Sequence, residues 1–189
     1  MSNAIKLGQW ILAQTPYRRE AMTHLKLQKL AFYCYGAALA FGCEDAVSDD
    51  IAFEAWEHGP VCRELWLQHR DQGATPIPFL PPEAAPSYAP EAARHMTDAL
   101  VVYSPLSAWS LRQESHTEAP WIEAHNRRPA TISTDVLRAH FEKKFAGREV
   151  KLPEYLGHTS SAALDGIPSH GYGSLRELAL VVLRVASNR

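Results

Sequence analysis

One helical segment constrains the fold more than any other part of the chain. The run from Leu25 to Phe41 reads LKLQKLAFYCYGAALAF, with Thr23 before it suited to cap a helix and Gly42 after it suited to end one. An apolar stripe runs along this segment and is formed by Leu27, Leu30, Ala31, Cys34, Ala38 and Phe41. The stripe broadens until the second half of the segment has no charged face left for water. Such a helix must be surrounded by other elements, so the sequence predicts a central core helix.

Polar residues in the first half of this segment argue against a membrane span. Lys26, Gln28 and Lys29 leave an uncharged stretch too short to cross a bilayer. The N-terminus has neither a basic segment before its apolar run nor a small-residue cleavage signature, so we expect no signal peptide. These patterns predict a cytoplasmic protein that does not contact a membrane.

Periodicity along the rest of the chain predicts a mainly α protein. A first helix capped by Asn3 should end before Pro16. Further helices are expected over residues 92–103, from residue 106 to about residue 114, and from Ser133 or Thr134 onward. We therefore expect a compact single-domain helical bundle, with one short strand or hairpin near residues 50–57.

The expected strand and its surroundings follow from alternation and from turn residues. Ile51 to Trp56 alternate apolar and polar positions, which predicts the only strand. Gly59 breaks this pattern, and Pro60 is suited to the first position of a new helix that extends to about Arg70. The proline-rich stretch over residues 73–90 should cross the surface as an extended loop.

Composition excludes several classes of protein. The chain has 189 residues, 46% of them hydrophobic, which is enough for a core without metal or disulfide support. Lysine and arginine number 19 against 21 acidic residues, giving a net charge of −2, so general nucleic-acid binding is disfavoured. Cys34, Cys43 and Cys62 form no CxxC pair, which favours a reducing compartment.

Candidate catalytic chemistry is weak in this sequence. A hydrolase with bound zinc would draw on imidazole, carboxylate and thiol ligands from two segments: Glu54, His58, Cys62, His116, Glu118 and His125. His116, Glu118 and His125 do not fall at the i, i+4 spacing of a helical metal site, and Pro120 lies between them. Capping and surface roles are the simpler interpretation, so we expect no metal, no cofactor and no enzymatic activity.

Two further chemical interpretations are also weak. Cys62 near a helix start would have a lowered thiol pKa, but no nucleophile pattern surrounds it, so a small packed side chain is the simpler interpretation. The segment GYGSL lacks the lysine and the spacing of a phosphate-binding loop. Lys143, Lys144 and Arg148 form a basic cluster that a solvated helical face explains.

Four segments in a fixed order resemble a known family. They are NAIKLGQWIL, LKLQKLAFYCYGAALAFG, FEAWEHGPVCRELW, and SPLSAWSLRQESHTEAPWIEAHN followed by ISTDVLRAHFEKK. Together they cover roughly residues 3–145 and resemble the Panacea domain family of antitoxins, also called SocA-like or phage-associated proteins. The resemblance predicts a Panacea domain over residues 1–147 and a C-terminal extension over residues 148–189 that ends in an amphipathic helix.

The resemblance implies a non-catalytic activity. Members bind and neutralise a protein toxin encoded beside them, or, in SocA-like members, present a toxin to a protease. The positions that correspond to the family's signature, or that lie beside it on a protein-binding surface, are Glu54, Trp56, His58, Gly59, Pro60, Trp66, His116, Pro120 and Trp121. This chain departs from the family in carrying CEDAVSDD before the strand, so the contact made there differs.

Physical reasoning adds expectations about this segment. Gly59-Pro60 should form a chain corner, and Trp56 should point away from the face of the strand that carries Phe53 and Ala55. His116 and Trp121 should lie near that corner in a shared network. Specificity for a toxin is assigned to the loop over residues 73–90 and to the amphipathic tail with Leu175, Leu178 and Val182.

Three functions stay open at this point. The first is an antitoxin that occludes a toxin by direct contact, and the second is an adaptor that delivers a toxin to a protease. The third, from a different class, is a metal-assisted hydrolase that uses His58, His116 and Glu118.

Overall fold

The computed structural model describes residues 1–145, apart from residues 16–17, 19–20, 49 and 128. These residues form a mainly α fold with a small antiparallel sheet. The α-helices and strands, in chain order, are α1 Asn3–Gln14, α2 His24–Ala40, α3 Glu44–Val47, β1 Phe53–Trp56, β2 Gly59–Val61, α4 Arg63–His69, α5 Pro90–Tyr103, α6 Ala108–Ser115, α7 Ala119–His125, β3 Thr131–Ile132 and α8 Thr134–Phe145. Short 3-10 turns lie at Arg70–Gln72 and Pro82–Ala84.

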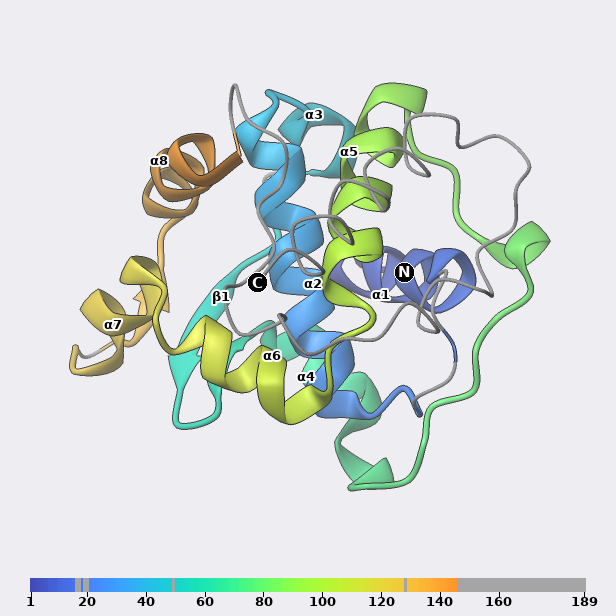
Figure 1. Ribbon diagram of the computed structural model, residues 1–189, viewed down its shortest axis with the longest axis horizontal. Coiled ribbons are helices and arrows are strands. Elements are labelled where there is room, and N and C mark those ends of the chain that lie inside the picture. The colour runs from blue at the N-terminus through green and yellow to red at the C-terminus, as the bar shows by residue number, and fades with distance from the viewer. Residues whose placement is uncertain (16–17, 19–20, 49, 128, 146–189) are drawn as a thin grey trace, which may run out of the picture.

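Helix α2 is the centre of the fold, as the sequence predicts. It runs through the middle of the molecule with α5 and α8 on opposite sides, and every residue from Lys26 to Ala40 is buried (Figure 1). The helix begins where the Thr23 hydroxyl accepts a hydrogen bond from the backbone N–H of Lys26, at 3.2 Å. Because all sides of this helix are covered, it organises the remaining elements.

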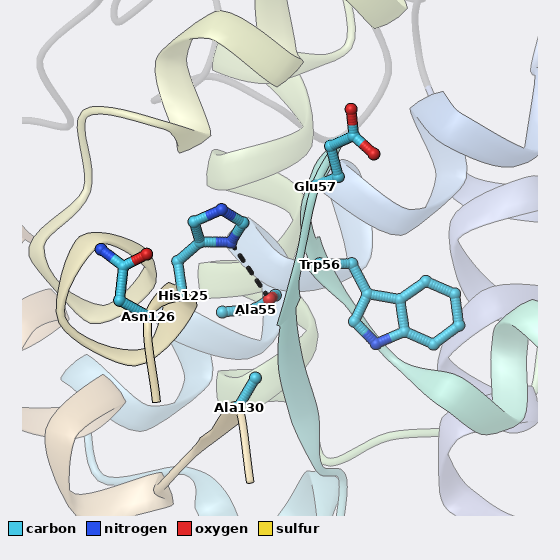
Figure 2. A pocket seen from close by; sticks show the side chains of 6 residues that line it. All are labelled: Ala55, Trp56, Glu57, His125, Asn126 and Ala130. Carbon is cyan, nitrogen blue, oxygen red and sulfur yellow. Dashed lines mark hydrogen bonds between the residues drawn. The ribbon is translucent and has the colours of Figure 1, made fainter. Parts of the chain in front are cut away.

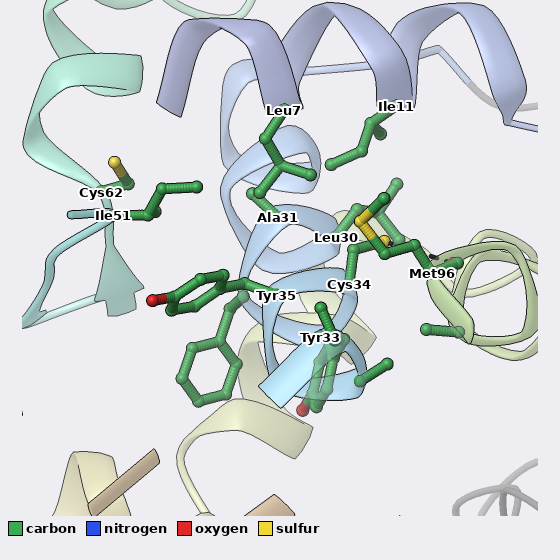
Figure 3. Packing of buried hydrophobic residues seen from close by; sticks show 14 of the residues in the cluster. Leu7, Ile11, Leu30, Ala31, Tyr33, Cys34, Tyr35, Ile51, Cys62 and Met96 are labelled. Atoms are coloured by element: carbon green, nitrogen blue, oxygen red, sulfur yellow. Dashed lines mark hydrogen bonds between the residues drawn. The ribbon is translucent and has the colours of Figure 1, made fainter. Parts of the chain in front are cut away.

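Close packing around the second half of α2 fixes the position of α8. Gly36 lies directly against the Phe141 ring, so that a Cβ atom there would come within 2.3 Å of the ring carbons. Phe32 meets Phe141 edge to face at 5.1 Å, and Tyr33 stacks on Tyr103 at 3.8 Å between ring centres. Figure 3 shows the same helix flanked by side chains from α1 and α5, including Leu7 and Met96.

The sheet differs from the sequence prediction. It has three strands in the order β2-β1-β3, all antiparallel, and the two residues Glu57 and His58 form the turn between β1 and β2. The predicted helix start at Pro60 is wrong, because Pro60 pairs with Ala55 inside β2 and α4 begins only at Arg63. A proline is tolerated there because β2 is an edge strand.

The sequence patterns do not predict helix α7 or strand β3. Pro120 does not separate two unrelated segments, because it lies in the first turn of α7, where its missing N–H costs no hydrogen bond. The short β3 pairs with β1 through Phe53 and Ile132. The predicted first helix is confirmed, but its N-cap is Ser2 and not Asn3, because the Ser2 hydroxyl accepts the hydrogen bond from the Ile5 N–H. The helix at Thr134 is confirmed, as is the extended character of the loop over residues 73–90, which a single 3-10 turn interrupts.

Two further findings complete the fold. Among the described residues, none of the helices combines the length and the apolar character that crossing a membrane requires. The three cysteines are buried, and the described part of the chain contains no disulfide. The predicted amphipathic helix with Leu175, Leu178 and Val182 lies outside the described residues.

Candidate functional site

The two segments that carry most of the signature positions come together in one place. We call this place the hairpin corner and define it as the β1–β2 hairpin, residues 53–61, with residues 112–125 of α6, α7 and their connection. The Trp121 indole donates a hydrogen bond to the Trp56 carbonyl at 2.9 Å, and the His125 Nδ1 lies 3.4 Å from the Ala55 carbonyl oxygen (Figure 2). Trp121 therefore forms a hydrogen bond of the predicted network, whereas His116 joins the corner by ring stacking and its Nε2 has no hydrogen-bond partner among the described residues.

Three stacked rings hold α7 against this hairpin. The His116 and Trp121 rings are nearly parallel, with 4.0 Å between ring centres. The His125 ring also stacks on Trp121, with 4.4 Å between ring centres. Burial and then the positive charges of Arg112 and Lys29 lower the pKa of His116 to about 4. The His116 imidazole is therefore neutral at pH 7 and packs as an aromatic ring, because protonation would place a further charge among these cations.

The other face of the hairpin carries a half-exposed aromatic pair. Trp56 donates from its indole nitrogen to the Glu54 carboxylate at 2.7 Å and meets the Trp66 ring at 5.2 Å. Arg70 lies over Trp66 at 5.7 Å. Phe53 and Ala55 are buried while Glu54 and Trp56 are half-buried, which confirms the predicted alternation along the strand.

Polar side chains of α2 hold the free edge of β2. The Gln28 side chain accepts a hydrogen bond from the Cys62 N–H at 2.8 Å and donates to the Cys62 carbonyl at 3.3 Å. The Lys29 ammonium donates to the Pro60 carbonyl at 2.8 Å. Pro60 lies in the edge strand β2 and Cys62 directly follows that strand, so these hydrogen bonds hold the end of the hairpin against α2.

Gly59 occupies a position that no other residue fits. Its φ angle is +95°, and a Cβ atom there would come within 2.6 Å of the Ser115 hydroxyl and 2.8 Å of the Lys29 ammonium. Burial and, to a lesser extent, the charge of Arg112 lower the pKa of Lys29 to about 7. Gly59 and Lys29 are therefore architectural residues of the corner.

A buried carboxylate fixes the start of α7. Glu118 is 4% exposed and accepts hydrogen bonds from His140 at 2.6 Å, from Tyr33 at 3.3 Å and from Lys144. Burial alone would raise the pKa of Glu118, but the hydrogen bond from His140 and the charge of Lys144 outweigh it and lower the pKa. Glu118 is thus an ionised link between α2, α7 and α8.

The candidate metal ligands do not form a shared site. His58 contacts Arg112, His116 stacks on Trp121, and Glu118 binds His140 and Lys144. Among the described residues, no three histidine, cysteine, aspartate or glutamate side chains are grouped as ligands of one ion. The described geometry therefore gives no support to the zinc hypothesis.

The Cys62 thiol is also unsuited to nucleophilic attack. Burial raises its pKa and outweighs the backbone hydrogen bonds at the start of α4 that lower it. This reverses the pKa shift expected from the helix dipole, because the side chain is packed in the core. The simpler interpretation of Cys62 as a small packed residue therefore holds.

A pocket of about 730 Å³ lies beside the hairpin, between the turn and the end of α7. Its lining is formed by Ala55, Trp56, Glu57, His125, Asn126 and Ala130 (Figure 2). The Trp56 indole points away from His125 across the strand, so two different surfaces border the same hairpin. The lining combines small apolar side chains with a carboxylate, an amide and an imidazole.

The signature positions divide by exposure into two groups. His58 is exposed, and Glu54, Trp56, Trp66, His116 and Trp121 are half-buried, while Gly59, Pro60 and Pro120 are buried. The sequence reasoning missed the partners that hold them, because a lysine such as Lys29 gives no local sign that it will be buried against a carbonyl.

Comparisons of the chain with models of protein families, with curated proteins and with solved structures found no match.

Proposed function

We propose that this chain is an antitoxin that binds a protein toxin encoded beside it and blocks that toxin by direct contact. The observation that supports this proposal is the assembly of FEAWEHGPVCRELW and SHTEAPW, two segments of the Panacea resemblance, into one surface-exposed corner. The corner presents aromatic side chains on a rigid support, which suits binding to another protein.

Many of the polar groups at the corner and beside it are occupied by structural contacts. Trp121, Gln28 and Lys29 bind backbone groups of the hairpin, and Glu118 is surrounded by basic and phenolic partners. Such a site offers shape and anchoring rings rather than a free acid, base and nucleophile in mutual contact. Binding is therefore favoured over catalysis.

The partner in this proposal is a protein. A net charge of −2 disfavours general binding to nucleic acid, and the three buried cysteines suit a reducing cytoplasm. Toxin specificity is assigned to the loop over residues 73–90 and to the tail with Leu175, Leu178 and Val182, as in the sequence prediction.

The test is growth of cells that express the product of the adjacent gene, with and without this protein, together with a pull-down between the two. The expected result is rescue of growth and a stable complex with the wild-type chain. Trp56→Ala should reduce both rescue and complex formation without lowering the temperature of unfolding much, since this indole is half-exposed. Glu142→Ala is the matched control, because Glu142 is exposed on α8, outside both the hairpin corner and the loop over residues 73–90.

A second measurement separates occlusion from delivery to a protease. An occluding antitoxin leaves the lifetime of the toxin unchanged or lengthens it, whereas an adaptor shortens it. The toxin half-life after translation is stopped, with and without this chain, distinguishes these outcomes. A toxic neighbour with neither rescue nor complex would overturn the proposal.

A further inference from the structure

One arginine of the hairpin corner is held firmly but lacks an acidic partner. The Arg112 Nε donates to the His58 Nδ1 at 3.3 Å, and the guanidinium lies over the Trp109 ring, 4.6 Å from its centre. Among the described residues, none accepts a hydrogen bond from either Nη group and none forms an ion pair with Arg112. Within the described part of the chain, the two Nη groups thus have no acceptor, and the contacts of this guanidinium are those with His58 and Trp109.

The surroundings of Arg112 are positively charged or neutral. The Arg112 charge acts on Lys29 and on His116, and it lowers the pKa of both. Two nearby carboxylates have other partners, because Glu54 accepts a hydrogen bond from Trp56 and Glu114 pairs with Lys144. Neither of these carboxylates forms an ion pair with Arg112.

The base of this site is an exposed indole. Trp109 is 59% exposed, more than the other large hydrophobic side chains of α6 and α7. Its ring face contacts the Arg112 guanidinium. An arginine fixed by a ring contact and by one hydrogen bond loses little conformational freedom when it binds. Exposed tryptophan and arginine side chains are also the residue types that dominate binding energy at protein interfaces.

We propose that Arg112, supported by Trp109 and His58, receives an aspartate or glutamate side chain of the partner protein. This inference rests on the proposed function and names the chemistry that the partner must present: a carboxylate beside an apolar residue that covers Trp109. Two parallel N–H groups match the two oxygens of a carboxylate. A polyphosphate is a poorer match, because one arginine in a chain of net charge −2 gives little attraction to a nucleic-acid backbone.

The experiment measures the affinity of the purified full-length chain for the product of the adjacent gene by calorimetric titration. Arg112→Gln should weaken binding about 10- to 100-fold, since it removes one partner of a desolvated charge pair. Arg112→Lys should recover only part of this loss, because an ammonium group cannot bind both carboxylate oxygens in parallel. Trp109→Ala should also weaken binding, and its exposure makes a folding defect unexpected.

Arg94→Gln is the matched control, because it removes the same charge from an exposed position on α5, away from the hairpin. A scan of acidic residues on the partner should then identify one whose alanine variant is non-additive with Arg112→Gln, by about fivefold or more. Equal affinity of wild type and Arg112→Gln for a bound toxin would overturn this inference and leave the proposed function intact. Absence of any complex with the wild-type chain would overturn both.

Discussion

The two halves of α2 are equally buried but differ in what they contact. The first half places Gln28 and Lys29 against the backbone of β2, while the second half places Gly36 against the Phe141 ring. The first contact depends on hydrogen bonds to a strand edge, and the second on close packing. One helix thus supports the hairpin corner at one end and an apolar core at the other.

This difference predicts different responses to substitution. Packing defects in the apolar half should destabilise the whole fold, because α2, α5 and α8 share that core. Polar defects in the first half should act mainly on the end of the hairpin, because the lost partners are Pro60 in β2 and Cys62 directly after it. The predictions below test this division, beginning with the largest expected effect.

Removal of the Phe141 ring should produce the largest loss. Phe141→Ala leaves a cavity against Gly36 and Phe32 and should reduce the free energy of unfolding by about 3–5 kcal/mol. Urea denaturation followed by circular dichroism measures this change. Lys143→Ala on the exposed face of the same helix is the control and should have little effect. Similar stabilities of the two variants would show that α8 does not pack on α2 as described.

Loss of the Gln28 amide should have a smaller effect that is concentrated at the hairpin. Gln28→Met leaves the buried Cys62 N–H without a partner, at a cost of about 1–3 kcal/mol, while the Cys62 carbonyl keeps its hydrogen bond from the Trp66 N–H at 2.9 Å. Relative to wild type, hydrogen exchange should then become faster at the amides of residues 59–62 and change little in the second half of α2. Uniformly faster exchange in both regions would contradict the division of the helix into two halves.

The sequence predicts the apolar half better than the polar half. The run FYCYGAALAF and the helix at Thr134 are recognisable because their periodicity is local, and both are confirmed. The sequence patterns predict a helix start at Pro60 and none at Pro120, yet only Pro120 lies in the first turn of a helix. The difference is tertiary, because Pro60 joins a strand whose edge is covered by residues 31–34 positions earlier in the chain.

The site could be located from the sequence, but its supports could not. FEAWEHGP and SHTEAPW indicate the hairpin corner, and the alternation correctly orients Trp56. Lys29, Arg112 and Glu118 acquire their roles only through partners that are distant in the chain. No local pattern distinguishes such a charged residue from one on a solvated helix face.

The stability of the polar half should depend on alkaline pH through Lys29. Its pKa falls from an ordinary value of 10.5 to about 7 in the folded chain, so the unfolded chain holds the extra proton between these values. Stability contributed by this group therefore rises from pH 7 toward pH 10.5, with a slope of at most about 1.4 kcal/mol per pH unit. Lys29→Met should remove this part of the pH dependence.

Comparison of urea denaturation at pH 7 and pH 9 for wild type and Lys29→Met measures this contribution. The free energy of unfolding of wild type, relative to that of Lys29→Met, should increase as the pH rises. Arg112→Gln should raise the pKa of Lys29 and reduce the effect, since the Arg112 charge is one cause of the lowered value. A constant difference across this range would mean that Lys29 is protonated in the folded chain at both pH values.

The smallest predicted effect on the pH dependence of stability comes from His116, at the surface side of the same corner. Its pKa falls from an ordinary 6.5 to about 4, so the unfolded chain binds a proton between these values that the folded chain excludes. Stability from this group is therefore complete above pH 6.5 and is lost as the pH falls toward 4. The direct measurement is the NMR titration of the His116 ring, with His116→Asn used to assign its signal. A midpoint near pH 6.5 would show that the ring is not held on Trp121 among the cations of the corner, and the stacked arrangement of α7 against the hairpin would then be wrong.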